Sequence, residues 1–241
     1  KIDVVNGFGK LVDNHTIEVT NEAGEKQMVE AEKIILATGT RSRDLPNIKR
    51  DGVKIIGYRE AMTLPQQPKS MVVIGSGAIG TEFAYFYKTL GTDVTLIEFM
   101  PDILPLEDKE ISKLLAREFK KIKMNVMTSS SVTNVDTTGE KCVVTVETPK
   151  GVTTIETDIV FMAAGVTPNL ENIGLEELGI QTERGKIIVD EYYKTSVEDV
   201  YAIGDIVPGQ ALAHVASAEA ICCVEKIAGL SPEPVDYSNV P

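Results

Sequence analysis

The segment that most constrains the fold of this chain is the run Met71–Gly80 taken together with Glu98. An apolar stretch ends at Gly75, and Gly77 and Gly80 follow with the spacing GxGxxG. A second apolar stretch then ends at Glu98, an acid. This order of strand, glycine turn, helix, strand and acid is typical of a βαβ unit that binds a dinucleotide.

Each glycine of the turn has a physical reason to be there. Gly75 permits the tight turn off the strand, Gly77 lets the main chain approach a diphosphate, and Gly80 lets the helix pack closely. We expect the helix to run from Ala78 to about Leu90, so that its free N–H groups and positive dipole end face the phosphates. The alternative is a glycine-rich turn that only joins a strand to a helix.

The acid at the end of the second strand bears on the choice of cofactor. Glu98 can accept hydrogen bonds from the ribose diol of an adenosine, whereas it would repel a 2′-phosphate. The segment Glu98–Asp102 contains no arginine that could receive such a phosphate. The sequence therefore predicts NAD rather than NADP, bound by Gly75, Gly77, Ala78, Ile79, Gly80 and Glu98.

Composition excludes several other classes of function. The net charge of −12 disfavours non-specific binding to nucleic acid or to an anionic membrane. No apolar run approaches the roughly 20 residues of a membrane-spanning helix, and no signal peptide is recognisable. Three cysteines make no disulfide framework, which favours a cytoplasmic location. We expect adjacent Cys222 and Cys223 to pack on a helix face, with a redox pair as the less favoured alternative.

The chain divides into three predicted segments. Residues 1–65 and 188–241 would form one domain around an inserted domain of residues 66–187, and the start at Lys1 suggests a piece of a longer protein. Expected elements are antiparallel meanders at 2–30 and 131–157, helices at 78–90, 107–122 and 212–229, and buried strands at 33–37, 71–74, 94–97, 158–162 and 200–203.

Two buried strands of the sequence resemble each other. Residues 34–39 end in Thr-Gly and lead to Pro46–Asn47, and residues 160–165 end in Ala-Gly and lead to Pro168–Asn169. Chance similarity between buried strands is one explanation, and two related nucleotide-binding units is the other. The second predicts an α/β fold: a Rossmann-like three-layer domain, with parallel sheet, helices and antiparallel meander, inserted in the remnant of a second, related domain.

The segments that carry these features resemble a known family. They are residues 34–40, 71–105, 201–205 and 211–214, and they are similar to the flavoprotein pyridine nucleotide-disulfide oxidoreductases, most of all to the dihydrolipoyl dehydrogenase branch. The resemblance spans essentially the whole chain. It implies that the inserted domain binds NAD and that the surrounding domain belongs to an FAD site.

The resemblance also implies roles for individual residues. Those implied near FAD are Gly9, Thr38, Gly39, Thr40, Gly204, Asp205, Ala211, Leu212, Ala213 and His214; those implied near NAD include Glu82, Val132, Ala164 and Gly165. Several of these residues also have a simpler, purely structural explanation. Thr38–Gly39 would be only a turn, Asp205 a cap, Glu82 an acid favoured by the helix dipole, Val132 a sheet-packing residue and His214 a packed or buried side chain.

The sequence also departs from the family pattern. No GxGxxG precedes Gly75, no two cysteines have the spacing CxxxxC of the family's redox pair, and Val166 follows Gly165 where many members carry arginine. We therefore expect a central portion of the family's protein, without catalytic residues or a metal site and inactive alone. The C-terminal dimerisation domain, with its general acid–base pair, would lie outside it.

Three functions follow from these expectations. In the first, the full-length parent is a homodimer that oxidises dihydrolipoamide through a disulfide and FAD and transfers hydride to NAD. Its partners would be lipoyl-bearing subunits of 2-oxoacid dehydrogenase complexes or the lipoyl protein of glycine cleavage. In the second, the parent is another flavoprotein, such as an NADH oxidase, a mercuric reductase or a soluble transhydrogenase. In the third, the chain is a non-catalytic NAD-binding module.

Overall fold

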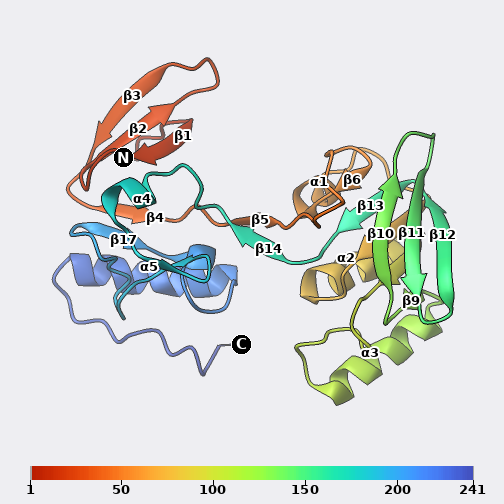
Figure 1. The fold of residues 1–241 in the computed structure, drawn as a ribbon. Helices are drawn as coiled ribbons and strands as arrows, with labels where there is room; N and C mark the ends of the chain where they lie inside the picture. The colour runs from red at the N-terminus through yellow and green to blue at the C-terminus, as the bar shows by residue number, and fades with distance from the viewer. Residues whose placement is uncertain (1, 241) are drawn as a thin grey trace. The chain divides into compact units, whose positions relative to one another are not determined.

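The computed structural model describes residues 2–240 and divides into two compact units. Unit 1 comprises Lys1–Arg41 and Thr167–Pro241, and unit 2 comprises Ser42–Val166 (Figure 1). Unit 2 is therefore inserted between the two segments of unit 1. The chain passes from one unit to the other within two short strands, β5 (Thr40–Ser42) and β14 (Val166–Pro168).

Unit 2 is built on a parallel sheet with strand order β6-β13-β7-β8-β9. The strands are β6 (Ile55–Ile56), β13 (Ile159–Met162), β7 (Ser70–Ile74), β8 (Asp93–Ile97) and β9 (Asn125–Met127). The β7 strand alternates its buried side chains between the two faces of the sheet, because successive residues of a strand point in opposite directions.

Helices cover one face of this sheet. They are α1 (Tyr58–Met62), α2 (Ala78–Thr89) and α3 (Lys109–Lys121). Val73, Leu96 and Phe161 from the strands pack with Ala84 of α2 and Phe119 of α3 in one apolar cluster. The side chain of Asp108 caps α3 by accepting hydrogen bonds from the amides of Glu110 and Ile111.

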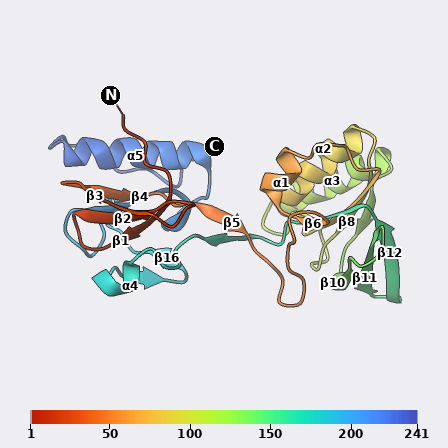
Figure 2. The ribbon, with the colours of Figure 1, turned by 90° about the horizontal axis from the view of Figure 1, so that it is seen from above.

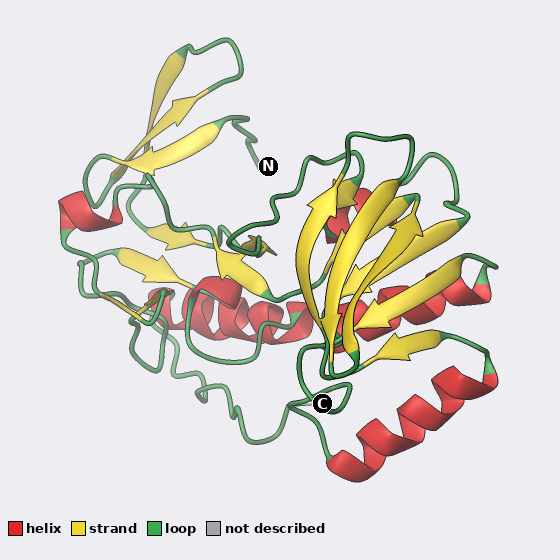
Figure 3. Cartoon of the chain, turned by 45° about the vertical axis from the view of Figure 1, so that its right-hand side comes forward, coloured by secondary structure: helices red, strands yellow, loops and turns green. Residues whose placement is uncertain are grey.

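An antiparallel meander covers the other face of the same sheet (Figure 3). It consists of β10 (Ser131–Asp136), β11 (Cys142–Thr148) and β12 (Gly151–Thr157). Val72, Ile74 and Val160 from the sheet pack there against Val144 and Val146. Unit 2 is thus the three-layer arrangement of helices, parallel sheet and meander that the sequence predicts.

Unit 1 contains a parallel strand pair, a meander and a long helix (Figure 2). The pair is β4 (Ile34–Leu36) with β17 (Val200–Ala202), the meander is β1 (Phe8–Leu11), β2 (Thr16–Thr20) and β3 (Lys26–Glu30), and the helix is α5 (Ala213–Ile227). Short elements complete it: α4 (Leu175–Leu178), β15 (Thr182–Glu183), β16 (Lys186–Ile187) and the 3-10 turn η1 (Gly204–Ile206).

The limits of the two units differ from the 65/66 and 187/188 divisions expected from the sequence. The β6 strand joins the sheet of unit 2 through β13, and this pairing places residues before 65 in unit 2. Ile187 is buried with Ile34 and Val200 in a core of unit 1, which places residues before 188 there. The outer limits of the expected domains, residues 1 and 241, lie outside the described residues.

Two expectations from composition can be compared with the fold. Among residues 2–240, no helix is both long enough and apolar enough to cross a membrane. Cys222 and Cys223 are free and buried in the cluster that packs α5 against Tyr193 and Tyr201. The burial of both side chains on α5 confirms the packed-helix interpretation of this pair, and the same burial raises the pKa of the Cys223 thiol to about 11.

Candidate functional site

In the sheet of unit 2, the order in which the chain adds strands reverses at β7, and this position locates the candidate site. β8 lies on one side of β7 and β13 on the other, so the carboxyl ends of β7 and β13 flank a topological switch point. In open α/β sheets, ligands bind in the crevice outside such a point. The turn Gly75–Gly80, which carries the GxGxxG motif and is called the fingerprint turn below, follows β7. Ala163–Gly165 follow β13 at the same edge of the sheet.

Two fingerprint glycines are required by close packing. Gly75 has φ +101°, and a Cβ added there would lie 2.5 Å from the carbonyl oxygen of Ala163. A Cβ added at Gly80 would lie only 1.9 Å from the carbonyl oxygen of Gly75. The first glycine therefore permits a left-handed turn beside β13, and the third permits α2 to approach the end of β7.

Gly77 differs from both, because a Cβ built there meets nothing within 4 Å. Its φ of −66° suits any residue, so neither packing nor backbone conformation requires glycine there. Gly77, Ala78 and Ile79 are exposed, and no side chain caps α2 at its N-cap residue, Gly77. The space and the backbone N–H groups there match what an anion at a helix N-terminus needs.

Glu98 lies at the carboxyl end of β8 and is buried, with 7% of its surface exposed. Its Oε2 accepts hydrogen bonds from the amide and from the hydroxyl of Ser76, both at 2.7 Å, and its Oε1 accepts one from the amide of Met100 at 2.8 Å. The carboxylate therefore fixes the fingerprint turn, and Oε1 keeps acceptor capacity for a further hydroxyl.

Sequence reasoning missed the link between Ser76 and Glu98. Ser76 is fully buried between Gly75 and Gly77. A serine between the first two glycines is the signal that could have revealed it, since a buried hydroxyl needs a hydrogen-bond partner.

The structure places the other predicted residues of unit 2 as follows. Glu82 is exposed in α2, one turn beyond Ala78. Val132, in β10 of the meander, is buried with Val146 of β11 against Ile97 of the parallel sheet, which is the sheet packing that stood as its simpler role. Its implied role beside adenine remains a prediction.

Ala164 and Gly165 lie at the switch point, and a cation not singled out from the sequence lies against them. The Arg43 guanidinium donates to the carbonyl oxygen of Ala164 through Nε at 3.0 Å and Nη2 at 2.5 Å. A Cβ built at Gly165, which has φ +100°, would lie 3.3 Å from Nη2 of Arg43.

These residues fit an adenine dinucleotide. The exposed N–H end of α2 can receive phosphate oxygens, the open space at Gly77 leaves room for them, and Glu98 lies at the end of the adjacent strand where a ribose would lie. The fit rests on the packing of the three glycines, which leaves Gly77 alone without a structural reason.

Unit 1 has its own set of predicted residues around the η1 turn. Thr40 donates its hydroxyl to Oδ2 of Asp205 at 2.6 Å, so β5 and η1 meet within unit 1. Thr38 donates its hydroxyl to the carbonyl oxygen of Asn169 at 2.7 Å, and the amide of Asn169 donates to the carbonyl oxygen of Gly39. The Thr-Gly turn is therefore tied to the Pro-Asn turn that follows β14.

Three residues that sequence reasoning did not select hold the η1 turn. The buried carboxylate of Glu219 accepts from the amide of Gly204 at 2.6 Å and from the hydroxyl of Tyr237 at 2.7 Å. The Lys186 ammonium donates to the carbonyl oxygens of Asp205, at 2.5 Å, and Val207, at 3.1 Å. Burial raises the pKa of Tyr237 above its ordinary value. No short motif indicates these contacts, because they join residues that lie 15 to 21 positions apart.

The remaining predicted residues of unit 1 are exposed. Ala211 precedes α5, Leu212 is its N-cap residue without a side-chain cap, and Ala213 and His214 form its first turn. Gly9 lies in β1 opposite Val19. The exposed start of α5 agrees with the predicted helix N-terminus, and the roles of these residues near FAD remain predictions.

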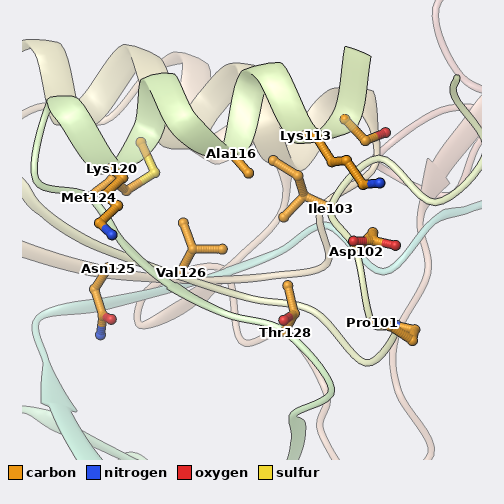
Figure 4. A pocket seen from close by; sticks show the side chains of 11 residues that line it. Pro101, Asp102, Ile103, Lys113, Ala116, Lys120, Met124, Asn125, Val126 and Thr128 are labelled. Atoms are coloured by element: carbon orange, nitrogen blue, oxygen red, sulfur yellow. The ribbon is translucent and has the colours of Figure 1, made fainter. Parts of the chain in front are cut away.

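A cavity of about 410 Å³ lies elsewhere in unit 2, between α3 and β9 (Figure 4). Lys113 and Lys120 approach it from α3, Asn125 and Val126 from β9, and Asp102 from the loop after β8. It includes none of the predicted dinucleotide-binding residues. We give the switch point more weight, because it combines exposed amide donors, open space and a buried carboxylate.

Comparisons with known proteins agree with the fold. A family model described as pyridine nucleotide-disulphide oxidoreductase matches residues 1–220. Dihydrolipoyl dehydrogenase from Zymomonas mobilis is 41% identical over 243 residues, which cover 100% of this chain and 52% of that protein. Dihydrolipoyl dehydrogenase 2, mitochondrial, from Arabidopsis thaliana is 40% identical over 244 residues and is covered to 48%.

Solved structures give the same result. LpdA from Mycobacterium tuberculosis has a TM-score of 0.86 and 30% identity, with 96% of this chain and 51% of that chain covered. The flavoprotein disulfide reductase RclA from Escherichia coli, at 22% identity and a TM-score of 0.84, shares the fold. The chain spans about half the length of the curated relatives it matches.

Proposed function

Because this chain belongs to the pyridine nucleotide-disulphide oxidoreductase family, we propose that unit 2 binds NAD at the switch point between β7 and β13. The observation that carries the proposal is the difference among the fingerprint glycines. Gly75 and Gly80 are required by packing, whereas Gly77 faces open space. A glycine without a structural reason, at the start of an uncapped helix, is what close approach of a diphosphate requires.

The residues of the site divide the binding between phosphate and ribose. The amides of Gly77, Ala78 and Ile79 bind phosphate oxygens, with the dipole of α2 favouring their negative charge. Glu98 fixes Ser76 through Oε2, and its Oε1, which already accepts from the amide of Met100, accepts a further hydrogen bond from a hydroxyl of the adenosine ribose. The same carboxylate repels a 2′-phosphate, so NAD is preferred over NADP.

Unit 1 contributes to an FAD site in this proposal. The backbone of Thr38–Thr40 and the η1 turn carrying Asp205 would hold the flavin nucleotide, and the exposed start of α5 at Ala213 and His214 would bind next to the flavin ring. When bound, the two cofactors supply the electron and hydride transfer. This chain binds and orients them, and we assign it no catalytic side chain.

The activity of the whole protein is a further part of the proposal. The relatives named dihydrolipoyl dehydrogenase support oxidation of protein-bound dihydrolipoamide, with this chain as the central portion of a homodimer that serves lipoyl-bearing subunits. The thiol pair of that reaction is not among Cys142, Cys222 and Cys223, all of which are buried. We therefore expect this chain alone to bind NAD without turning over lipoamide. Relatives named as mitochondrial leave the cytoplasmic location a prediction.

Calorimetric titration of the chain with NADH and with NADPH tests the proposal. NADH should bind more tightly than NADPH, and Gly77→Val should weaken NADH binding by more than about tenfold, or about 1.4 kcal/mol. Gly139→Val is the matched control, because Gly139 is also exposed and lacks a positive φ. Equal NADH affinity in wild type and Gly77→Val, or no binding by wild type, would contradict the site.

A further inference from the structure

Arg43 lies in unit 2 immediately after β5, with its guanidinium against the loop that follows β13. Two of its five N–H groups, on Nε and Nη2, donate to the carbonyl oxygen of Ala164 at 3.0 and 2.5 Å. Its guanidinium is also the nearest group to a Cβ built at Gly165. The guanidinium is thus held in place by the backbone of the 163–165 loop while its Nη1 end stays available.

This loop lies at the switch point, beside the start of the fingerprint turn. Gly75 lies so close to it that a Cβ there would be 2.5 Å from the carbonyl oxygen of Ala163 and 3.2 Å from the amide of Ala164. The residue that Arg43 holds, Ala164, therefore lies directly beside the first residue of the fingerprint turn. Arg43 places a cation at the junction of β7 and β13, where the sheet topology predicts a bound ligand.

The charge of Arg43 has no carboxylate partner among residues 2–240. By contrast, Arg41 donates to Glu171 at 2.6 Å and Arg50 donates to Asp44 at 2.7 Å. Arg43 forms no such ion pair within the described part of the chain, and its side chain is exposed. An arginine fixed by a backbone oxygen, in a strongly acidic chain, is a ready receptor for an external anion.

The fingerprint itself supplies no cationic side chain. Residues 71–80 contain neither lysine nor arginine, and uncharged Val166 follows Gly165. A dinucleotide diphosphate carries two negative charges, which the amides and dipole of α2 only partly balance. The guanidinium geometry suits phosphate oxygens through two parallel hydrogen bonds.

We propose that Arg43 is the phosphate-binding cation of the dinucleotide site, donating through its Nη hydrogens to a diphosphate oxygen. This inference rests on the proposed function of unit 2, to which it adds a residue that binds the phosphates of the ligand. The simpler role for Arg43 is a tether that joins residue 43 to the 163–165 loop. The two roles differ in what they predict for the affinity lost when Arg43 is replaced. Only the phosphate-binding role makes that loss depend on phosphate in the ligand and on the salt concentration.

The test is calorimetric titration of the full chain with NADH, ADP-ribose and adenosine at low and high salt. Arg43→Met should weaken NADH and ADP-ribose by about five- to tenfold at low salt and should leave adenosine unchanged. The loss should shrink at high salt, where charge interactions are screened. Arg43→Lys should restore part of the affinity, because it keeps the charge without the fork.

Arg59→Met provides the matched control, because Arg59 is an exposed arginine on α1 of the same unit. It should change NADH affinity less than twofold. Equal NADH affinity in wild type and Arg43→Met overturns this inference alone, and so does a loss that also affects adenosine and ignores salt. Absence of NADH binding by wild type overturns the proposed function and this inference together. Melting curves for each variant identify any that fails to fold, and Arg43→Lys then decides the question.

Discussion

The two glycine turns, Gly75–Gly80 in unit 2 and Gly204–Val207 in unit 1, are held in different ways. The first is fixed by its own backbone and by one carboxylate, Glu98, at the end of the adjacent strand. The second is fixed by side chains from three separate places, Thr40, Lys186 and Glu219. We therefore expect the first turn to tolerate a larger side chain only at Gly77, where the Cβ position is open. The second turn should lose stability when any one of its three side chains is removed.

The largest expected effect is a difference in unfolding free energy between substitutions at two glycines of the first turn. Gly80→Ala should lower the free energy of unfolding by about 3 kcal/mol, because its Cβ would collide with the backbone oxygen of Gly75 at 1.9 Å. Gly77→Ala should change it by less than about 1 kcal/mol, since nothing lies near its Cβ. Urea denaturation of the two variants measures both values, and similar losses would contradict the packing argument.

The next effect tests the carboxylate under the second turn. Glu219→Gln should cost about 2 kcal/mol, because the amide keeps one acceptor oxygen, loses the charge that strengthens both hydrogen bonds and makes the Tyr237 hydroxyl reverse its donor role. Tyr237→Phe removes one of the two donors and should cost about 1 kcal/mol. Urea denaturation gives both values. If Tyr237→Phe costs more than Glu219→Gln, the carboxylate is not the centre of this network.

A smaller loss should follow removal of the ammonium that holds the same turn. Lys186→Met leaves the carbonyl oxygens of Asp205 and Val207 without that donor and should cost about 1 kcal/mol. Lys194→Met, an exposed lysine of the same unit, should cost less than about 0.5 kcal/mol. Thermal and urea unfolding measure the free energy lost in the two variants. Equal losses would show that the second turn does not depend on the Lys186 ammonium.

The smallest effect concerns pH and unit 1. Hydrogen bonds from the Arg41 guanidinium hold the pKa of Glu171 at about 2, below its ordinary value of 4.5. A carboxyl with a lowered pKa in the folded state stabilises above pH 4.5, and that stabilisation is lost as the pH falls towards 2. Because both side chains are largely exposed, the contribution is under about 1 kcal/mol.

Glu171→Gln isolates this contribution. The variant should unfold more easily than wild type at pH 7, and the difference should disappear between pH 4.5 and 2. Urea denaturation at several pH values measures it. A difference that persists at pH 2 would show that the amide disturbs packing rather than charge.

Sequence patterns predicted the regular elements of both units well. The fingerprint helix, the amphipathic helix after Asp108 and the meanders follow from glycine spacing, a capping acid and apolar periodicity, which act over a few residues. The short elements β6, α1 and α4 escaped prediction. Each is too short to show a period, and tertiary contacts decide its conformation.

The candidate site was predicted only in part, for the same reason. The glycines and Glu98 carry local signals, and the structure adds the hydrogen bonds of Ser76 that join them. Arg43 escaped selection because its partner, Ala164, lies far along the chain in the loop that follows β13. Glu219 escaped because a buried carboxylate in a helix looks like any surface acid in the sequence.

The amino-acid sequence alone determined that a βαβ unit with a glycine turn forms, and that its adjoining strand ends in an acid, because those properties depend on neighbours within a few residues. Only the tertiary structure decided where the inserted unit begins, which charged side chains hold the second turn and which arginine faces the switch point. The inserted unit and the Arg43 contact depend on segments brought together across more than a hundred residues, and the Lys186 and Glu219 contacts span 15 to 21 residues. No local pattern extends over either distance.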